Sequence, residues 1–181
     1  MPAESTHEIG RRGTIETVEL LWRILGNRIR LPFNAYDHAE KLAFDQGRPF
    51  GVPPFSFDLK GNLERRDPRR VGGSEAVEVF VEVKKYSTGD GLLGEFASFL
   101  QRAAVAASVP AHKDTWFFFV SNVPFGSSKG VQLCNGEYLA ECSTSWHEQL
   151  KKDVSTLHSR IVVIVATESF VRMLQRWSAD E

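Results

Sequence analysis

The segment Glu75–Tyr86, EAVEVFVEVKKY, decides the fold prediction. Its residues alternate in type, with valine at every second position from Val77 to Val83 and mostly charged residues between them. Successive side chains of a strand point to opposite faces of a sheet, so this pattern predicts a strand with one apolar face. It also places Glu82 and Lys84 together on the other face.

A second alternating segment precedes this strand. In Phe55–Lys60, FSFDLK, apolar residues alternate with polar ones, and Asp58 falls in the middle of the predicted strand. The polar segment Gly61–Ser74 between the two contains Pro and Gly and predicts a turn. We therefore expect an antiparallel hairpin with a long basic tip, and Asp58 on the strand next to Glu82.

Helices are predicted on both sides of the hairpin in the sequence. Thr14–Gly26 has apolar residues at helical spacing, which predicts a buried stripe of Ile15, Val18, Trp22 and Leu25. Gly91–Ser108 follows the hairpin and has a second apolar stripe, made of Leu92, Phe96, Phe99, Ala103 and Ala107.

Two short apolar segments, Thr115–Val120 and Arg160–Ala166, predict buried strands. Weaker patterns predict helices at Asp37–Gln46, Gly136–Asp153 and Ser169–Trp177. This order of elements predicts a single α/β domain over residues 1–181, with a mixed sheet flanked by helices.

Composition narrows the function classes. The 181 residues carry a formal net charge of -1, which argues against a protein that coats nucleic acid by bulk charge. The two cysteines cannot form a disulfide framework, and the five histidines lack the paired spacing of a zinc site. With no apolar segment long enough to span a membrane, we expect a cytoplasmic protein without a membrane partner.

The acids of the hairpin suggest a site. Burying Asp58, Glu82 and Lys84 together is costly unless they are paired or bind a metal. Two neighbouring carboxylates suit Mg²⁺, and a lysine beside them places positive charge near an attacked phosphate. An acid followed two residues later by lysine also occurs at Asp58–Lys60, so the spacing alone carries no weight.

In its order of Phe57-Asp58, then Glu82-Val83-Lys84, then a helix from Gly91, the chain resembles the PD-(D/E)xK nuclease superfamily. The resemblance covers roughly residues 10–120. It implies a restriction-endonuclease-like fold with an αβββαβ core. Only two strands are predicted before the central helix, and we expect the third within Arg48–Val52 or within the hairpin connection.

The resemblance also implies roles for individual residues. Asp58 and Glu82 would bind Mg²⁺ or Mn²⁺, and Lys84 would be the catalytic lysine. Glu16 resembles an additional acid on the first helix, and Gln101 resembles a glutamine that some members direct toward the site. The implied activity is that of a metal-dependent nuclease, most simply a DNA endonuclease in defence or repair, working as a homodimer or with a partner protein that supplies specificity.

Several alternatives stay open at this stage. Arg65, Arg66, Arg69 and Arg70 of the hairpin tip suit contacts with nucleic-acid phosphates, but they also suit a solvated turn. The charged strand face could be a structural ion-pair network, which would make the chain a non-catalytic module that binds nucleic acid or protein. The site chemistry fits RNA cleavage as well as DNA cleavage.

Overall fold

The computed structural model describes residues 3–44, 52–66, 73–86, 88–89, 91–125, 141–143, 157–167 and 169. Its α-helices are α1 (Ala3–Leu25), α2 (Ala39–Leu42) and α3 (Leu92–Ser108), and the 3-10 helices are η1 (Gly26–Arg28) and η3 (Pro110–His112). The strands are β1 (Ile29–Asn34), β2 (Ala43–Phe44), β3 (Phe55–Ser56), β4 (Leu59–Arg66), β5 (Ser74–Lys84), β6 (Trp116–Ser121) and β7 (Ile161–Val165).

Five strands form one mixed sheet in the order β1-β4-β5-β6-β7. Strand β4 pairs antiparallel with β1 and with β5. Strands β5, β6 and β7 run parallel to one another. Strands β2 and β3 form a separate two-stranded sheet. The prediction of a mixed α/β sheet flanked by helices is confirmed.

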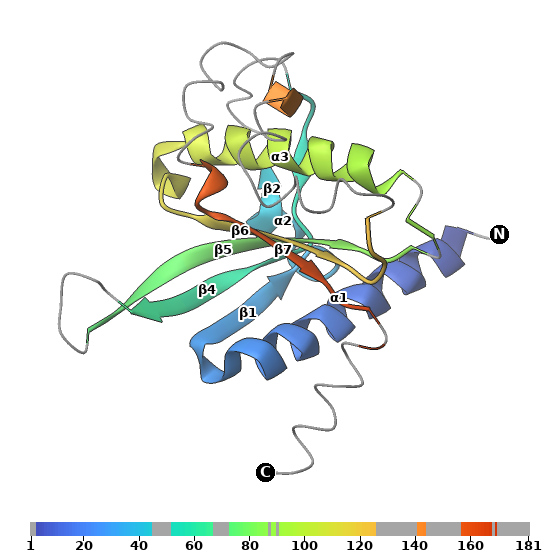
Figure 1. Cartoon of the computed structure of the whole chain (residues 1–181), viewed down its shortest axis with the longest axis horizontal. Coiled ribbons are helices and arrows are strands. Elements are labelled where there is room, and N and C mark those ends of the chain that lie inside the picture. Colours follow the sequence, from blue (N-terminus) through green and yellow to red (C-terminus); the bar gives the residue numbers. More distant parts are fainter. Residues whose placement is uncertain are drawn as a thin grey trace.

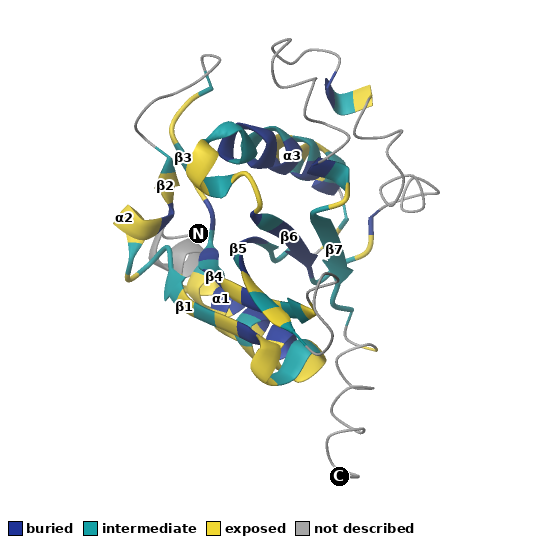
Figure 2. Ribbon diagram, turned by 90° about the vertical axis from the view of Figure 1, so that its left-hand side faces the viewer, coloured by how far each residue is buried: buried dark blue, intermediate teal, exposed yellow. Residues whose placement is uncertain are grey.

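The sheet lies between α3 on one face and α1 on the other (Figures 1 and 2). The alternation of β5 sets this division. Val77, Val79 and Val81 join the core beneath α1, whereas Phe80 joins the aromatic core beneath α3. Glu82 and Lys84 have the same parity as Phe80, so they face α3.

The third strand of the antiparallel part is β1, which comes directly after α1. The prediction that it lies within Arg48–Val52 or the hairpin connection is therefore wrong. Val52 has no regular secondary structure, and residues 48–51 lie outside the described residues. The predicted turn also starts too early, because β4 continues as far as Arg66.

The buried face of α1 differs from the predicted stripe. Ile15 and Trp22 are 54% and 57% exposed, whereas Thr14, Thr17 and Leu21 are buried. The helix lies close to β5 at Gly13, whose Cα is near the side chains of Val83 and Lys85. Thr14 and Thr17 are the small residues buried near this contact, and Leu20 and Leu21 are buried further along the helix, whereas Ile15 and Trp22 face outward.

The other predicted elements have mixed outcomes. The helix predicted at Gly91–Ser108 is confirmed as α3, and its stripe is buried from Leu92 to Ala103. The strand predicted at Arg160–Ala166 is β7, which is half-buried rather than fully buried because it is an edge of the sheet.

The helix predicted at Asp37–Gln46 is only the short α2. Those at 136–153 and 169–177 fall largely outside the described residues.

Gly61 of β4 faces an irregularity in the pairing of β1 with β4. A Cβ at this position would lie 1.8 Å from the carbonyl oxygen of Arg30. We therefore expect Gly61→Ala to lower the free energy of unfolding by about 2–4 kcal/mol, because backbone atoms of β1 must move. Urea denaturation followed by circular dichroism measures the change.

Gly94→Ala is the matched control. No atom lies within 4 Å of a Cβ at Gly94, and alanine favours the interior of α3, so this variant should be as stable as the native chain or more stable. Equal stability of the Gly61 and Gly94 variants would contradict the close contact.

Candidate active site

Asp58 and Glu82 are opposite each other at the end of the hairpin. Leu59 pairs with Val81, so the register places Asp58 across from Glu82. Asp58 lies in the bend just before β4, not in the middle of a strand as predicted. Its backbone N–H donates to the carbonyl of Val81 (3.0 Å), and its carbonyl accepts from Ala35 (2.9 Å). Contacts with β5 and the end of β1 thus fix the Asp58 backbone.

Glu82 is a buried carboxylate that is only 3% exposed. Its Oε1 accepts hydrogen bonds from Nζ of Lys84 at 2.8 Å and from Nη2 of Arg102 at 2.7 Å. The other oxygen, Oε2, is buried and has no hydrogen-bond partner among the residues that the structure describes. Since a buried carboxylate oxygen is rarely left unpaired, Oε2 is a vacant acceptor.

Lys84 connects the sheet with α3. Besides Glu82, its Nζ contacts Oε2 of Glu95 at 3.0 Å. Burial acts to lower the pKa of Lys84, but the charges of Glu82 and Glu95 outweigh burial and raise the pKa above its ordinary value. The lysine is therefore a fixed positive charge and not a proton acceptor in this arrangement.

The carboxyl of Asp58 is destabilised in its charged form. Burial and the negative charge of Glu82 raise the pKa of Asp58 to about 6, above its ordinary value of 3.8. The N–H of Val83, which donates to Oδ2 at 2.7 Å, opposes this rise, as do the charges of Lys84 and Arg102. The negative charges of Asp58 and Glu82 are only partly compensated, so a cation bound between these carboxylates would relieve their repulsion.

The donor set fits a hard divalent cation. Within the described ranges, no group of three or more His, Cys, Asp or Glu side chains could hold a metal ion. Asp58 and Glu82 therefore supply two carboxylates at most, which suits Mg²⁺, an ion that keeps several waters and takes few protein ligands. The unpaired Oε2 of Glu82 is the observation that supports this fit.

Two further predicted site residues have other surroundings. Glu16 forms ion pairs with Arg12 and with Lys85, the latter at 2.5 Å, on the α1 face of the sheet. These hydrogen bonds outweigh the effect of burial and lower the pKa of Glu16. Gln101 is half-buried on α3, but it is the next residue, Arg102, that contacts Glu82.

Arg102 and Glu95 are site residues that the sequence reasoning missed. They are seven residues apart on α3, so they share one helix face, beside Phe96 and Phe99 of the buried stripe. The sequence signal that could have indicated them is a pair of opposite charges next to the apolar stripe of the predicted helix. Arg102 and Lys84 compensate the charge of Glu82, and Glu95 pairs with Lys84.

Two of the four predicted nucleic-acid arginines, Arg65 and Arg66, lie away from the acid pair. Arg65 pairs with Glu75 and lies over the ring of Trp116, 5.6 Å from its centroid, whereas Arg66 is exposed. Arg69 and Arg70 lie outside the described residues. Arg66 is eight residues from Asp58, which corresponds to about 26 Å at roughly 3.3 Å per strand residue.

Lys60, the lysine of the other acid-to-lysine spacing (Asp58–Lys60), belongs to a different cluster of side chains, around Glu78. Lys60 contacts Glu78 at 2.9 Å, and Glu78 also accepts hydrogen bonds from His112 and Thr115. Burial acts to raise the pKa of Glu78, but these hydrogen bonds outweigh it and lower the pKa to about 2. This carboxylate is fully paired, in contrast to Glu82.

No protein-family model, curated protein or solved structure matches the chain. None of the helices among the described residues has the length and apolar character needed to cross a membrane.

Replacing Asp58 should stabilise the metal-free chain. The folded-state pKa of about 6 exceeds the ordinary 3.8, so the native chain loses stability as pH rises through this interval. Asp58→Asn removes the charge and retains an oxygen for the N–H of Val83. In EDTA at pH 8 we expect the free energy of unfolding to rise by about 1–3 kcal/mol.

Urea denaturation as a function of pH measures this effect. The gain should disappear below about pH 4, where the native carboxyl is protonated in both the folded and the unfolded state. A gain that is the same at acid and alkaline pH would show that repulsion with Glu82 is not its cause.

Removing Arg102 should have the opposite effect. Arg102→Met keeps the apolar stem but leaves Lys84 as the one cation on Glu82 among the described residues. We expect the free energy of unfolding to fall by about 1–3 kcal/mol at pH 7. The neighbouring Gln101→Met is the control, with an expected change below about 0.5 kcal/mol. Equal losses in the two variants, measured by urea denaturation, would contradict the role of the Glu82 contact.

Proposed function

We propose that this chain is a metal-dependent nuclease of restriction-endonuclease-like architecture. Its αβββαβ core would consist of α1, β1, β4, β5, α3 and β6, the order in which these elements follow one another along the chain. The substrate would be the phosphodiester backbone of nucleic acid, most simply DNA, in a cytoplasmic setting.

One observation carries the proposal. Glu82 is buried, its Oε1 is paired with two cations, and its Oε2 has no partner although Asp58 lies opposite. A purely structural ion-pair cluster would pair both oxygens, as the cluster around Glu78 does. The vacant oxygen is better explained by a ligand for which Asp58 and Glu82 are prepared.

Asp58 and Glu82 would hold the Mg²⁺ ion, with the N–H of Val83 and the cations Lys84 and Arg102 fixing the two carboxylates. When bound, Mg²⁺ lowers the pKa of a water and offsets charge on phosphate oxygens. Lys84 would place its positive charge beside the phosphate. Because the pKa of Lys84 is raised, it stabilises charge and does not take a proton from water.

A non-catalytic module that binds nucleic acid or protein is the second candidate function. The pairing of Glu82 with both Lys84 and Arg102 favours it, since two cations already neutralise that carboxylate. Cleavage of RNA instead of DNA is a variant of the first candidate. A nuclease that cuts both strands of a duplex would need a second active site, so a homodimer or a partner protein belongs to the proposal.

A cleavage assay separates these candidates. Plasmid DNA, single-stranded DNA and RNA are incubated with the full chain in Mg²⁺, in Mn²⁺ and in EDTA. We expect cleavage that needs the metal and that falls at least about 100-fold in Glu82→Gln, Asp58→Asn and Lys84→Met, because each removes a ligand or a charge at the reacting phosphate.

The lysine of the second acid-to-lysine spacing, Lys60, provides a matched control for Lys84. Lys60→Met removes the lysine that pairs with Glu78, outside the acid pair, and should retain cleavage within about three-fold. Equal loss in the Lys60 and Lys84 variants would contradict the assignment of Lys84. Absence of cleavage on every substrate would favour the second candidate, whereas cleavage that persists in EDTA would contradict the role of the metal.

A further inference from the structure

A solvent-facing groove runs between α1 and the edge strand β1. Its apolar floor includes Val18, Ile29 and Leu31, and its rim carries Trp22, Arg23 and Arg30. The volume is about 600 Å³, within the range of roughly 300–1,000 Å³ that is typical of small-ligand sites. The groove lies on the α1 side of the sheet, opposite α3.

The exposure of Trp22 is unusual for so large an apolar side chain. It is 57% exposed, the largest value among the exposed large hydrophobic residues of the described part of the chain. An exposed indole beside an apolar floor is a surface on which a flat ring can stack.

Positive charge accompanies the indole. Arg23 and Arg30 are exposed, and neither forms an ion pair with any residue in the described ranges. Glu19 is the acid that lines the groove. Two arginines against one acid, in a chain whose formal charge is -1, give this groove a local charge that favours an anion.

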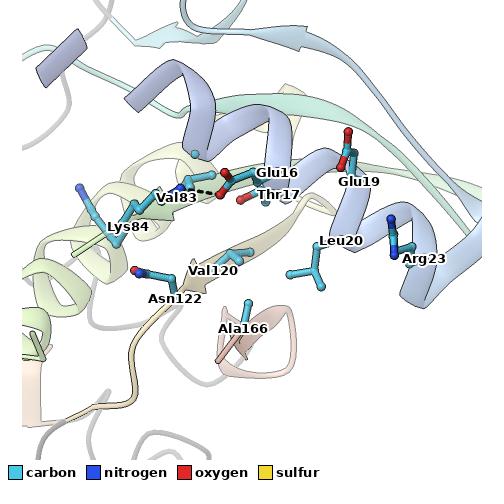
Figure 3. Close-up of a pocket in the computed structure, with 12 residues that line it drawn as sticks. Glu16, Thr17, Glu19, Leu20, Arg23, Val83, Lys84, Val120, Asn122 and Ala166 are labelled. Carbon is cyan, nitrogen blue, oxygen red and sulfur yellow. Dashed lines mark hydrogen bonds and ion pairs between the residues drawn. The ribbon is translucent and has the colours of Figure 1, made fainter. Parts of the chain in front are cut away.

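The groove adjoins a second cavity beside α1. Glu19 and Arg23 also line a neighbouring cavity of about 320 Å³ that Lys84 borders. Figure 3 shows Lys84 at one end of this cavity and Arg23 at the other, with Glu16 and Glu19 between them along α1. The groove is thus linked through this cavity to the end of β5 that carries Lys84, whereas Asp58 and Glu82 line neither cavity.

We propose that this groove binds a single-stranded segment of the nucleic-acid substrate, with an unpaired base on Trp22 and flanking phosphates on Arg23 and Arg30. This inference rests on the proposed nuclease function and names its substrate class. Bases in a duplex are already stacked and cannot reach the indole, so the groove selects single strands. The arginines contact phosphates of DNA and RNA alike.

Binding is tested in the full chain with Asp58→Asn, so that no substrate is cut. Fluorescence anisotropy measures the affinity for labelled (dT)12, (rU)12 and a 12-base-pair duplex. We expect Trp22→Ala to weaken binding of the single strands about ten-fold and Trp22→Phe less than about three-fold, because phenylalanine still stacks. Arg23→Gln with Arg30→Gln should lower the salt dependence of log K by about 1.4.

Ile15→Ala is the matched control, since Ile15 is 54% exposed on the same helix but lines neither cavity. It should bind single strands like its parent. Unchanged affinity of Trp22→Ala would overturn the proposal, as would a dimer in sedimentation velocity that Trp22→Ala dissociates. If the native chain cleaves nothing but Trp22→Ala still weakens binding selectively, the nuclease proposal fails while the groove stands.

Discussion

The burial of the Glu82 carboxylate is the constraint on which the surrounding structure depends. A charged group this deep in a protein loses hydration that only ion pairs, hydrogen bonds or a metal can replace. Lys84 from the same strand and Arg102 from α3 replace it at one oxygen, and Glu95 holds Lys84 in position. The docking of α3 on the sheet is thus tied to the charge of one residue. The second oxygen, which lacks a hydrogen-bond partner in the described part of the chain, is the feature on which the proposal of a metal ligand rests.

The two-residue period of β5 separates two kinds of surface. On the α3 face, Glu82 and Lys84 extend a row that begins at Glu78 and passes through Phe80, so the acid pair borders an aromatic core. On the α1 face, the valines pack in one core with Leu20 and Leu21 of the helix, and Lys85 is paired with Glu16. The side chains of the neighbouring residues Lys84 and Lys85 therefore belong to different faces, and both residues border the cavity beside α1.

Regular alternation made β5 predictable, and the apolar stripe made α3 predictable, because each follows from burial of one face. Strand β1 was missed although Ile29, Leu31 and Phe33 alternate, since Pro32 suggested a loop. Proline is tolerated here because β1 is an edge strand with a free side. The register that places Asp58 opposite Glu82 agrees with the pairing predicted from the hairpin. The contact of Arg102 with Glu82 could not be predicted, because it depends on how α3 is turned over the sheet.

The orientation of a helix on the sheet, which the sequence does not determine, also explains why the buried stripe of α1 was predicted wrongly. Its sequence contains two apolar stripes, one through Ile15 and Trp22 and another through Leu20 and Leu21, and periodicity cannot rank them. Packing on the sheet decides which stripe is buried, because contact with the valines of β5 favours the side of the helix that carries Gly13 and Thr17. A Cβ at Gly13 would lie 3.5 Å from the side chain of Lys85 and 3.7 Å from that of Val83, an ordinary van der Waals distance, so the helix packs closely on the strand with this side and directs Trp22 outward. The exposed indole therefore follows from how the helix reaches the strand that carries Glu82 and Lys84.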